Sequence, residues 1–172
     1  MKISSKFLLL FILVLASCYS EMVNAQSARK FSLGLNVGHS PNTRHVGLAI
    51  GGDVRYQFNV TKHLSIPLTA GFTSIKYKDR VFFGTTLKGG SRQYYPLKLG
   101  IKGNFNKTGL GLYGLLEGGI VVNLIGLKGG SGIPTVFSTA IGYALKNRID
   151  LAIKLEDYTF NGFIGIRAAY AF

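Results

Sequence analysis

The stretch VGLAIGGDVRYQF, Val46 to Phe58, decides the fold class. Apolar side chains take every second position over most of its length, and small or polar side chains fill the positions between. A helix repeats every 3.6 residues and cannot place such an alternating set on one face, whereas successive residues of a strand point to opposite faces. The stretch therefore predicts a β-strand with one bulky apolar face and one small or polar face.

The same alternation recurs along the chain and predicts eight strands, with no helix of useful length after the leader. Tight turns are expected at 60–63, 106–108 and 146–148, and longer segments at 40–45, 78–91, 125–133 and, shorter, at 158–162. Short turns at one end and longer loops at the other are typical of a transmembrane barrel, and an even strand count leaves both mature termini at the short-turn end. The predicted strands cover 31–38, 46–58, 64–72, 97–102, 110–122, 137–145, 149–156 and 164–172.

The alternation does not say which face points outward, because a soluble ligand-binding barrel also alternates, with its apolar face inward. The interior of an eight-stranded barrel is just wide enough to be filled by side chains. One face here carries Leu, Ile, Val, Phe or Tyr in nearly every row, which is too much volume for that interior. The other face is rich in Gly, Ala and Ser. We therefore expect an all-β, antiparallel up-and-down barrel with its bulky face toward lipid.

Charged residues of both signs lie on the predicted inward face, where four of the six acidic residues of the mature chain occur. A buried charge is tolerated when it is paired and hydrogen-bonded, so the balance predicts a charge network in the lumen. Such a network either plugs the lumen or lines a narrow pore, and the strand count favours the plug. The predicted network consists of Asp53, Arg55, Lys98, Lys102, Glu117, Asp150, Lys154, Glu156 and Arg167.

The N-terminal segment has the features of a secretory signal peptide. Its apolar run, FLLLFILVLA from Phe7 to Ala16, is too short for a spanning helix, which needs about 20 residues, and it suits the apolar region of a signal. We expect cleavage after Ala25, which leaves 26–172 as one barrel domain and 1–25 as the removed leader. The segment LASC resembles a lipobox, so acylation of Cys18 is the alternative.

Cysteine content and charge narrow the chemistry of the mature chain. Cys18 is the only cysteine, so its removal with the leader excludes disulfides, zinc knuckles and thiol nucleophiles. With Lys2, Lys6 and Glu21 in the leader, the mature chain carries 18 Lys and Arg against 6 Asp and Glu. An exported barrel does not meet the genome, so we expect no nucleic-acid partner.

The longest predicted loop and its flanks are strongly basic, with Asp79 as the only acid among them. Lipopolysaccharide in the outer leaflet is phosphorylated, so these cations are candidates to contact its phosphates. An ordinary solvated run of charge is the equal alternative, and a protein partner is not identified by the sequence. The candidate lipopolysaccharide contacts are Lys76, Lys78, Arg80, Lys88 and Arg92.

The C-terminal stretch FIGIRAAYAF resembles the β-signal of bacterial outer-membrane barrels. In that signal the final strand ends in Phe, with aromatic or apolar residues at alternate positions before it. Arg167 stands where the family often has Gly. The resemblance implies that the barrel assembly machinery reads the last strand during insertion. The residues that match as the assembly signal are Ile164, Ile166, Tyr170 and Phe172, with Ala168 between them.

A wider resemblance covers the whole mature chain. QYYPLKLGIKGNF, followed by a turn and GLGLYGLLEGGI, is similar to the Bacteroidota-type outer membrane protein β-barrel domain, and the chain as a whole resembles small OmpA/OmpX-like eight-stranded barrels. The resemblance implies an integral outer-membrane address, with both mature termini periplasmic. It often comes with no assigned activity, and we expect a structural or binding role through basic extracellular loops.

Catalytic and metal-binding motifs are sparse. GLKGGSG, from Gly126 to Gly132, lacks the spacing of a phosphate-binding loop and has no helix pattern after it, so we expect a loop tip. His39 and His45 flank the first long loop without a carboxylate fixed nearby, and we expect neither a metal nor a cofactor. Two lipid A enzyme families of this architecture use His and Ser near the outer rim, which His39 with Ser40 or Ser91 would match. We predict no catalytic residues, and the alternative function is a lipid A-modifying enzyme or a narrow channel.

Overall fold

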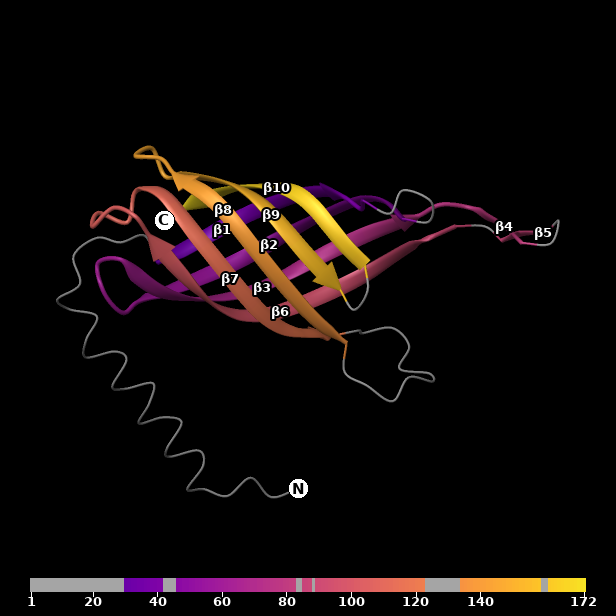
Figure 1. Ribbon diagram of the computed structural model, residues 1–172, viewed down its shortest axis with the longest axis horizontal. Coiled ribbons are helices and arrows are strands. Elements are labelled where there is room, and N and C mark those ends of the chain that lie inside the picture. Colours follow the sequence, from indigo (N-terminus) through magenta and orange to yellow (C-terminus); the bar gives the residue numbers. More distant parts are fainter. Residues whose placement is uncertain (1–29, 42–45, 83–84, 88, 123–133, 159–160) are drawn as a thin grey trace, which may run out of the picture.

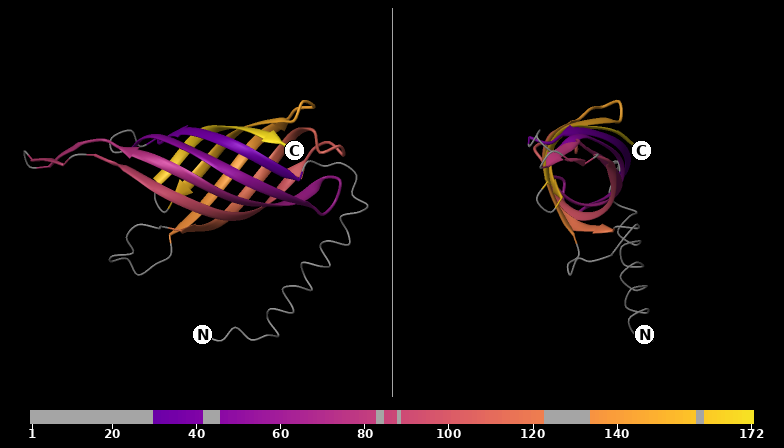
Figure 2. Two further views of the ribbon diagram at one scale, coloured as in Figure 1. Left: turned by 180° about the vertical axis from the view of Figure 1, so that it is seen from behind. Right: turned by 90° about the vertical axis from the view of Figure 1, so that its right-hand side faces the viewer.

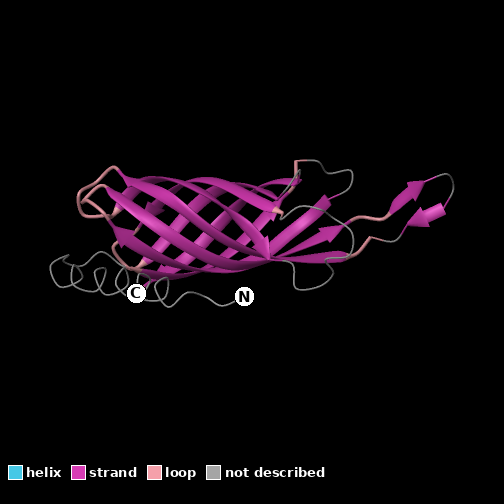
Figure 3. Ribbon diagram, turned by 90° about the horizontal axis from the view of Figure 1, so that it is seen from below, coloured by secondary structure: helices cyan, strands magenta, loops and turns pink. Residues whose placement is uncertain are grey.

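The structure is a computed structural model that describes residues 30–41, 46–82, 85–87, 89–122, 134–158 and 161–172. Within these residues there are ten strands and no helix. Figure 3 colours the strands magenta. The predicted leader, its cleavage site after Ala25, Cys18, His45 and the loop at 125–133 lie outside the described residues. The strands are β1 Phe31–His39, β2 Val46–Asn59, β3 Leu64–Tyr77, β4 Arg80–Phe82, β5 Thr85–Leu87, β6 Ser91–Asn104, β7 Gly111–Val122, β8 Thr135–Ala144, β9 Ile149–Tyr158 and β10 Asn161–Ala171.

Eight of the strands close into one barrel, in the order β1-β10-β9-β8-β7-β6-β3-β2, and every neighbouring pair is antiparallel. Figure 1 shows the barrel from the side, and the right-hand view of Figure 2 looks along it. The first and last strands pair directly, and the amide of Phe172 donates to the carbonyl of Phe31 at 2.8 Å. Closure leaves no open edge in this sheet. The predicted eight-stranded antiparallel barrel is therefore confirmed.

The predicted orientation of the two faces is also confirmed. In β9, Ile153 is 62 % exposed, whereas Lys154 beside it is 8 % exposed. The same contrast separates Ile166 at 63 % from Arg167 at 1 % in β10. Bulky apolar side chains thus point away from the barrel, and the charged residues between them point into the lumen. In the described part of the chain, no helix is long and apolar enough to cross a membrane.

The predicted long connection over 78–91 contains a short hairpin that the sequence analysis did not predict. β3 continues to Tyr77, β6 begins at Ser91, and β4 and β5 pair as a separate two-stranded sheet between them. Figure 1 shows this ribbon protruding beyond one end of the barrel. The amide of Tyr77 donates to the carbonyl of Gly90 at 2.7 Å, and the amide of Gly89 donates to the Asp79 carboxylate at 2.6 Å. Each strand of the ribbon has only three residues, which is too short for alternation to mark it in the sequence.

The lumen near the ribbon end is apolar, which the rule of a small or polar inward face does not predict. An inward cluster there is buried and ends in a stack of rings. The ring centres of Tyr94 and Tyr158 are 5.3 Å apart, and those of Tyr158 and Phe163 are 6.1 Å apart. The Tyr77 and Tyr94 hydroxyl oxygens lie 3.0 Å apart above them. We call this apolar cluster and its rings the aromatic cap, and it covers the charged middle of the lumen. Its buried members are Ala49, Ile75, Val121, Val136, Tyr158 and Phe163.

Candidate functional site

The predicted charge network occupies the middle of the lumen. All nine residues point inward, and none is more than 8 % exposed. Seven ion pairs involve all nine residues, five cations and four carboxylates, and divide them into two groups. One group holds Arg55, Glu117, Lys98, Glu156 and Lys154, and the other holds Lys102, Asp150, Arg167 and Asp53. Burial of charge is costly unless each group is paired and hydrogen-bonded, so the partners of each carboxylate decide whether this interior is stable. Four carboxylates organise the network.

The first carboxylate, Asp53 on β2, is clamped by Arg167 on β10. Arg167 Nε donates to Oδ2 at 2.9 Å and Nη2 donates to Oδ1 at 2.6 Å, a bidentate geometry. Asn36 on β1 donates to the same carboxylate at 2.7 Å. A Cβ at Gly34 would lie 2.8 Å from the guanidinium, so this glycine provides the room for Arg167. The clamp joins β10 to β2 across β1 and so ties together the seam where the barrel closes.

The second carboxylate, Glu117 on β7, accepts from four strands. Arg55 Nη2 lies 3.3 Å from Oε1, and Lys98 Nζ lies 3.4 Å from Oε2. The hydroxyls of Thr69 and Ser138 donate at 2.6 Å and 3.0 Å. Glu117 itself is 1 % exposed. Four donors satisfy both oxygens of this carboxylate, as a buried charge requires.

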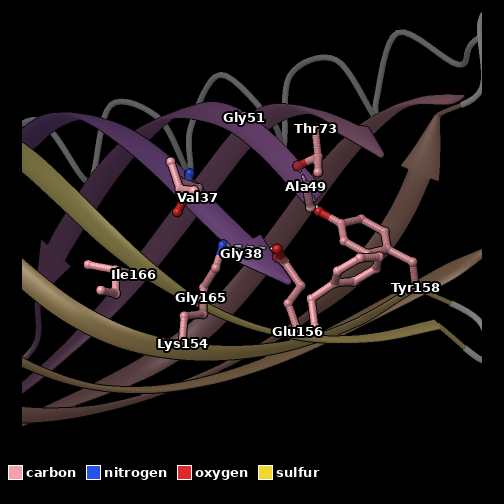
Figure 4. A pocket seen from close by; sticks show the side chains of 12 residues that line it. Val37, Gly38, Ala49, Gly51, Thr73, Lys154, Glu156, Tyr158, Gly165 and Ile166 are labelled. Atoms are coloured by element: carbon pink, nitrogen blue, oxygen red, sulfur yellow. Dashed lines mark hydrogen bonds and ion pairs between the residues drawn. The ribbon is translucent and has the colours of Figure 1, made fainter. Parts of the chain in front are cut away.

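The third carboxylate, Glu156 on β9, lies toward the aromatic cap. Lys98 Nζ donates to Oε1 at 2.5 Å, and Lys154 Nζ lies 2.9 Å from Oε2. Lys98 therefore bridges Glu117 and Glu156. Figure 4 shows Glu156 and Lys154 beside a cavity of about 20 Å³ that Thr73 and Tyr158 also line. A cavity of this size has room for about one water molecule.

The fourth carboxylate, Asp150 on β9, lies toward the short-turn end. The Tyr113 hydroxyl donates to it, and Lys102 Nζ lies 3.7 Å from it. The same ammonium lies 3.9 Å from the centre of the Tyr113 ring, within cation–π distance. Arg167 Nη1 is 3.9 Å from Asp150, which links this group to the clamp. A Cβ at Gly142 would lie 2.3 Å from the Tyr113 ring, so Gly142 makes room for the ring.

Neutral partners of the network were missed by sequence reasoning. Tyr113, Thr69, Ser138 and Asn36 each donate to one of the carboxylates. Their positions carried a usable signal, because alternation places each of them on the small or polar face of its strand. Tyr113, for example, precedes Glu117 by four positions in β7. Parity assigns such residues to the lumen, although it does not assign their partners.

The candidate lipopolysaccharide contacts lie at the ribbon end. Lys76, Lys78 and Arg92 are exposed there, and the Arg92 guanidinium lies 5.3 Å from the centre of the Tyr77 ring. Arg80 opens β4, and Lys88 lies outside the described residues. Lys76 and Arg92 therefore stand on the paired ends of β3 and β6, Lys78 follows β3, and Arg80 alone of the described candidates belongs to the β4–β5 ribbon.

The His and Ser residues of the alternative enzyme site lie apart. His39 ends β1 and is exposed, whereas Ser40 next to it is buried. Ser91 opens β6, and two strands, β2 and β3, lie between β1 and β6. At about 4.8 Å per strand, roughly 14 Å separates β1 from β6. No group of three potential metal ligands occurs among the described residues.

The residues that match the assembly signal point outward along β10 and at the chain end. Ile164, Ile166 and Tyr170 are 49 %, 63 % and 44 % exposed, and Phe172 is 56 % exposed. The Phe172 ring centre is 5.7 Å from that of Phe31 and 5.1 Å from that of Tyr170. These rings form an aromatic group near the C-terminal end of the chain, which Figure 1 marks C at the short-turn end of the barrel.

Comparisons with known proteins bear on the fold. No family model and no curated protein matches the chain, so membership of the Bacteroidota-type family is not confirmed. A solved structure from the de novo design of transmembrane β-barrels matches with a TM-score of 0.55 and 12 % identity, over 86 % of this chain and 98 % of the design.

Two further solved structures are similar at lower scores. The solution NMR structure of the designed TMB2.3 matches with a TM-score of 0.49 and 8 % identity, over 86 % of this chain and 97 % of that one. The Yersinia pestis outer membrane protein Ail, in a phospholipid bilayer nanodisc, matches with a TM-score of 0.48 and 17 % identity, over 84 % and 100 %. The first of these designed barrels matches the fold of this chain. With the outward apolar face and the closed strand order, it shows that the chain has the fold of an eight-stranded transmembrane β-barrel.

Proposed function

We propose that the protein is a small integral outer-membrane barrel of the OmpA/OmpX-like kind, with a structural or binding role. Its mature termini would lie in the periplasm, and its basic residues at the ribbon end would contact phosphate groups of lipopolysaccharide. The single observation that carries the proposal is the apolar outer surface. Thirty-one large apolar side chains among the described residues are exposed. Soluble monomers rarely expose contiguous apolar patches beyond a few hundred Å².

The membrane placement is further supported by the backbone pairing of the barrel. Hydrocarbon offers no partner for backbone polar groups, so strands can cross a bilayer only in a closed barrel. Aromatic side chains such as Tyr56, Tyr143 and Tyr170 lie near the short-turn end, and Phe72 and Tyr95 pack 5.5 Å apart toward the other end. Aromatic girdles at both interfaces are typical of transmembrane barrels.

The filled lumen favours a structural or binding role over a channel. The charged side chains at its centre are at most 8 % exposed, and the aromatic cap covers them at the ribbon end. An ion would have to break buried pairs to pass. The binding surface is then the ribbon end, where exposed Lys76, Lys78 and Arg92 are the cations available to phosphates.

The test of the binding role is the amount of lipopolysaccharide retained by the purified barrel. Removal of three cations in the variant K76Q/K78Q/R92Q should lower retention several-fold at low salt, and the difference should shrink at high salt because exposed charges are screened. The matched control, K76R/K78R/R92K, keeps the three positive charges at this end and should retain lipopolysaccharide like the parent. Equal retention by all three proteins contradicts this role.

Two measurements separate the proposal from the alternatives. Planar bilayers that contain the purified barrel should show no conductance steps, and steps that depend on Glu117 would instead establish a channel. Mass spectrometry of lipid A from cells with and without the protein should give the same species. A modified lipid A that depends on His39 would establish the lipid A enzyme and overturn the structural or binding role.

A further inference from the structure

Basic residues also surround the opposite end of the barrel, where the short turns lie. Every junction between neighbouring strands at this end carries at least one cation. Lys62 is in the β2–β3 turn, Lys107 in the β6–β7 turn, Lys146 and Arg148 in the β8–β9 turn, and Lys30 precedes β1 beside the end of β10. We call these five residues the basic collar.

No exposed Asp or Glu among the described residues lies at this end of the barrel. Among the described residues, the exposed acids are Asp79 and Asp157, and both lie at the ribbon end. Asp150 is close to the short turns in the chain, but it points into the lumen and is 7 % exposed. The excess positive charge of the protein is therefore shared between its two ends, while the lumen is nearly balanced. A ligand of the collar must be anionic.

Exposed aromatic side chains lie close to the residues of the basic collar. Phe105, two residues before Lys107, is 75 % exposed, and Tyr143, three residues before Lys146, is 53 % exposed. Phe172 and Tyr170 lie beside the start of β1, where Lys30 stands. Amphipathic rings settle at the headgroup level of a bilayer, and cations just beyond them reach the phosphates.

Arg148 holds an unusual backbone conformation in its turn. Its φ is 70°, and it is the only described residue other than glycine with a positive φ. Gly or Asn adopts this left-handed conformation with little strain, and a three-residue hairpin loop commonly places Gly there. The Arg148 carbonyl accepts from the amide of Ala171 at 2.8 Å, which ties the turn to the last strand. An arginine at a position suited to glycine indicates that its side chain has a use.

We propose that the basic collar binds the phosphate headgroups of anionic phospholipids in the leaflet around the short-turn end. The distribution of the charges favours lipid over a protein partner, because they are spread over all four strand junctions and do not gather on one side. Cations near an anionic membrane surface gain attraction from it. The proposal rests on the membrane placement proposed above, but not on the contact between the ribbon and lipopolysaccharide.

The test is photo-crosslinking in lipid vesicles, read out by peptide mass spectrometry. The barrel is refolded into phosphatidylcholine vesicles that contain a trace of headgroup-photoactivatable lipid, either phosphatidylglycerol or phosphatidylcholine. At low salt, the anionic probe should label the peptides of the three short turns at least about three-fold more than the zwitterionic probe. The preference should fall toward unity at high salt, because the charges are screened.

Two variants make the result specific to the collar. K62Q/K107Q/R148N should lose the preference at the short turns, and Asn keeps the left-handed conformation at position 148 available. K76Q/K78Q/R92Q should keep it. Equal labelling of the parent's short turns by both probes overturns the collar proposal and leaves a protein partner as the remaining ligand. If the parent does not insert into the vesicles and gives no heat-modifiable band on a gel, the membrane placement itself is refuted.

Discussion

The two faces of strand β9 meet opposite environments. Ile149, Leu151, Ile153 and Leu155 point outward and are 36 % to 62 % exposed, whereas Asp150, Lys154 and Glu156 point inward and are at most 8 % exposed. A soluble barrel reverses this arrangement. The difference shows that two separate forces stabilise one strand, because burial in lipid acts on its outer side and paired charges act on its inner side.

The contrast also explains why the register of the strands is well defined. A slip of one residue would turn every isoleucine of β9 into the lumen and every charge toward lipid. Ion pairs such as Arg167 with Asp53 and Lys98 with Glu156 connect strands that are far apart in the sequence, and they form only in the observed register. The inner face therefore contributes specificity, and the outer face contributes the affinity for lipid.

The largest effect is expected from breaking the inner face at Glu117. Glu117→Ala removes the only acid that pairs with Arg55 among the described residues and leaves Lys98 with Glu156 alone. Removal of one partner from a buried pair costs about 3–5 kcal/mol, and we expect about 3 kcal/mol here, because Lys98 keeps a partner. Urea unfolding of the refolded barrel in vesicles measures this change.

Glu117→Gln is the control for the same site. It removes the charge but keeps a carbonyl that can accept from Thr69 or Ser138, so its cost should be smaller than that of Glu117→Ala. If both variants unfold at the urea concentration of the parent, the lumen pairs do not stabilise the barrel.

A charge on the outer face should have the next largest effect. Ile166→Lys places an ammonium in the apolar band, where Ile166 pairs with Val37 and Ile153. The cost near the bilayer midplane is about 2–4 kcal/mol, so both insertion in cells and refolding in vesicles should suffer. Ile166→Val keeps the position apolar and should behave like the parent. Normal refolding of Ile166→Lys in lipid would show that this face does not meet hydrocarbon.

The packing inside the lumen can be tested with two glycines of different surroundings. Gly142→Ala places a Cβ 2.3 Å from the Tyr113 ring, so the ring must move away from Asp150. Overpacking of this kind costs about 1–3 kcal/mol. Gly114→Ala, on the neighbouring strand, meets nothing within 4 Å and should change stability little. Comparable urea midpoints for the two variants would argue against a filled lumen.

The smallest effect on stability is expected at the chain end. Deletion of Phe172 removes a ring that is 56 % exposed and contacts Phe31 and Tyr170. Complete burial of such a ring is worth about 1.5–3 kcal/mol, so a half-exposed ring should contribute less. If the ring is an assembly signal, the amount inserted in cells should fall sharply while vesicle refolding stays nearly normal. Phe105→Ala removes an exposed ring at the same end and should leave the yield in cells unchanged.

Sequence alone predicted the barrel because its evidence is local. The alternation in Val46–Asn59 is visible within one strand, and it assigned Asp53 and Arg55 to the lumen. The β4–β5 ribbon escaped detection because strands of three residues are too short to show a period. The inward Ile75 and Phe163 were missed because the aromatic cap departs from the small inward residues found elsewhere in the barrel.

The pairing within the lumen could not be predicted for a different reason. Lys102 lies on β6, next to the strand β7 that carries Glu117, yet it pairs with Asp150 on β9. Which charges meet depends on the tilt and stagger of the strands, which are properties of the closed barrel. Alternation specifies a face and not a height along the barrel axis, so it predicts the members of the network without their partners.

The contrast between the two faces can be tested most directly without any substitution. Methyl groups are present on both faces: Ile141, Ile153 and Ile166 point outward, and Ile75, Leu115 and Val136 point inward. In a methyl-labelled barrel in phospholipid nanodiscs, nuclear Overhauser effects to lipid acyl chains should appear for the outward set and be absent for the inward set. Acyl-chain contacts to Ile75, Leu115 or Val136, with none to the outward isoleucines, would contradict the account.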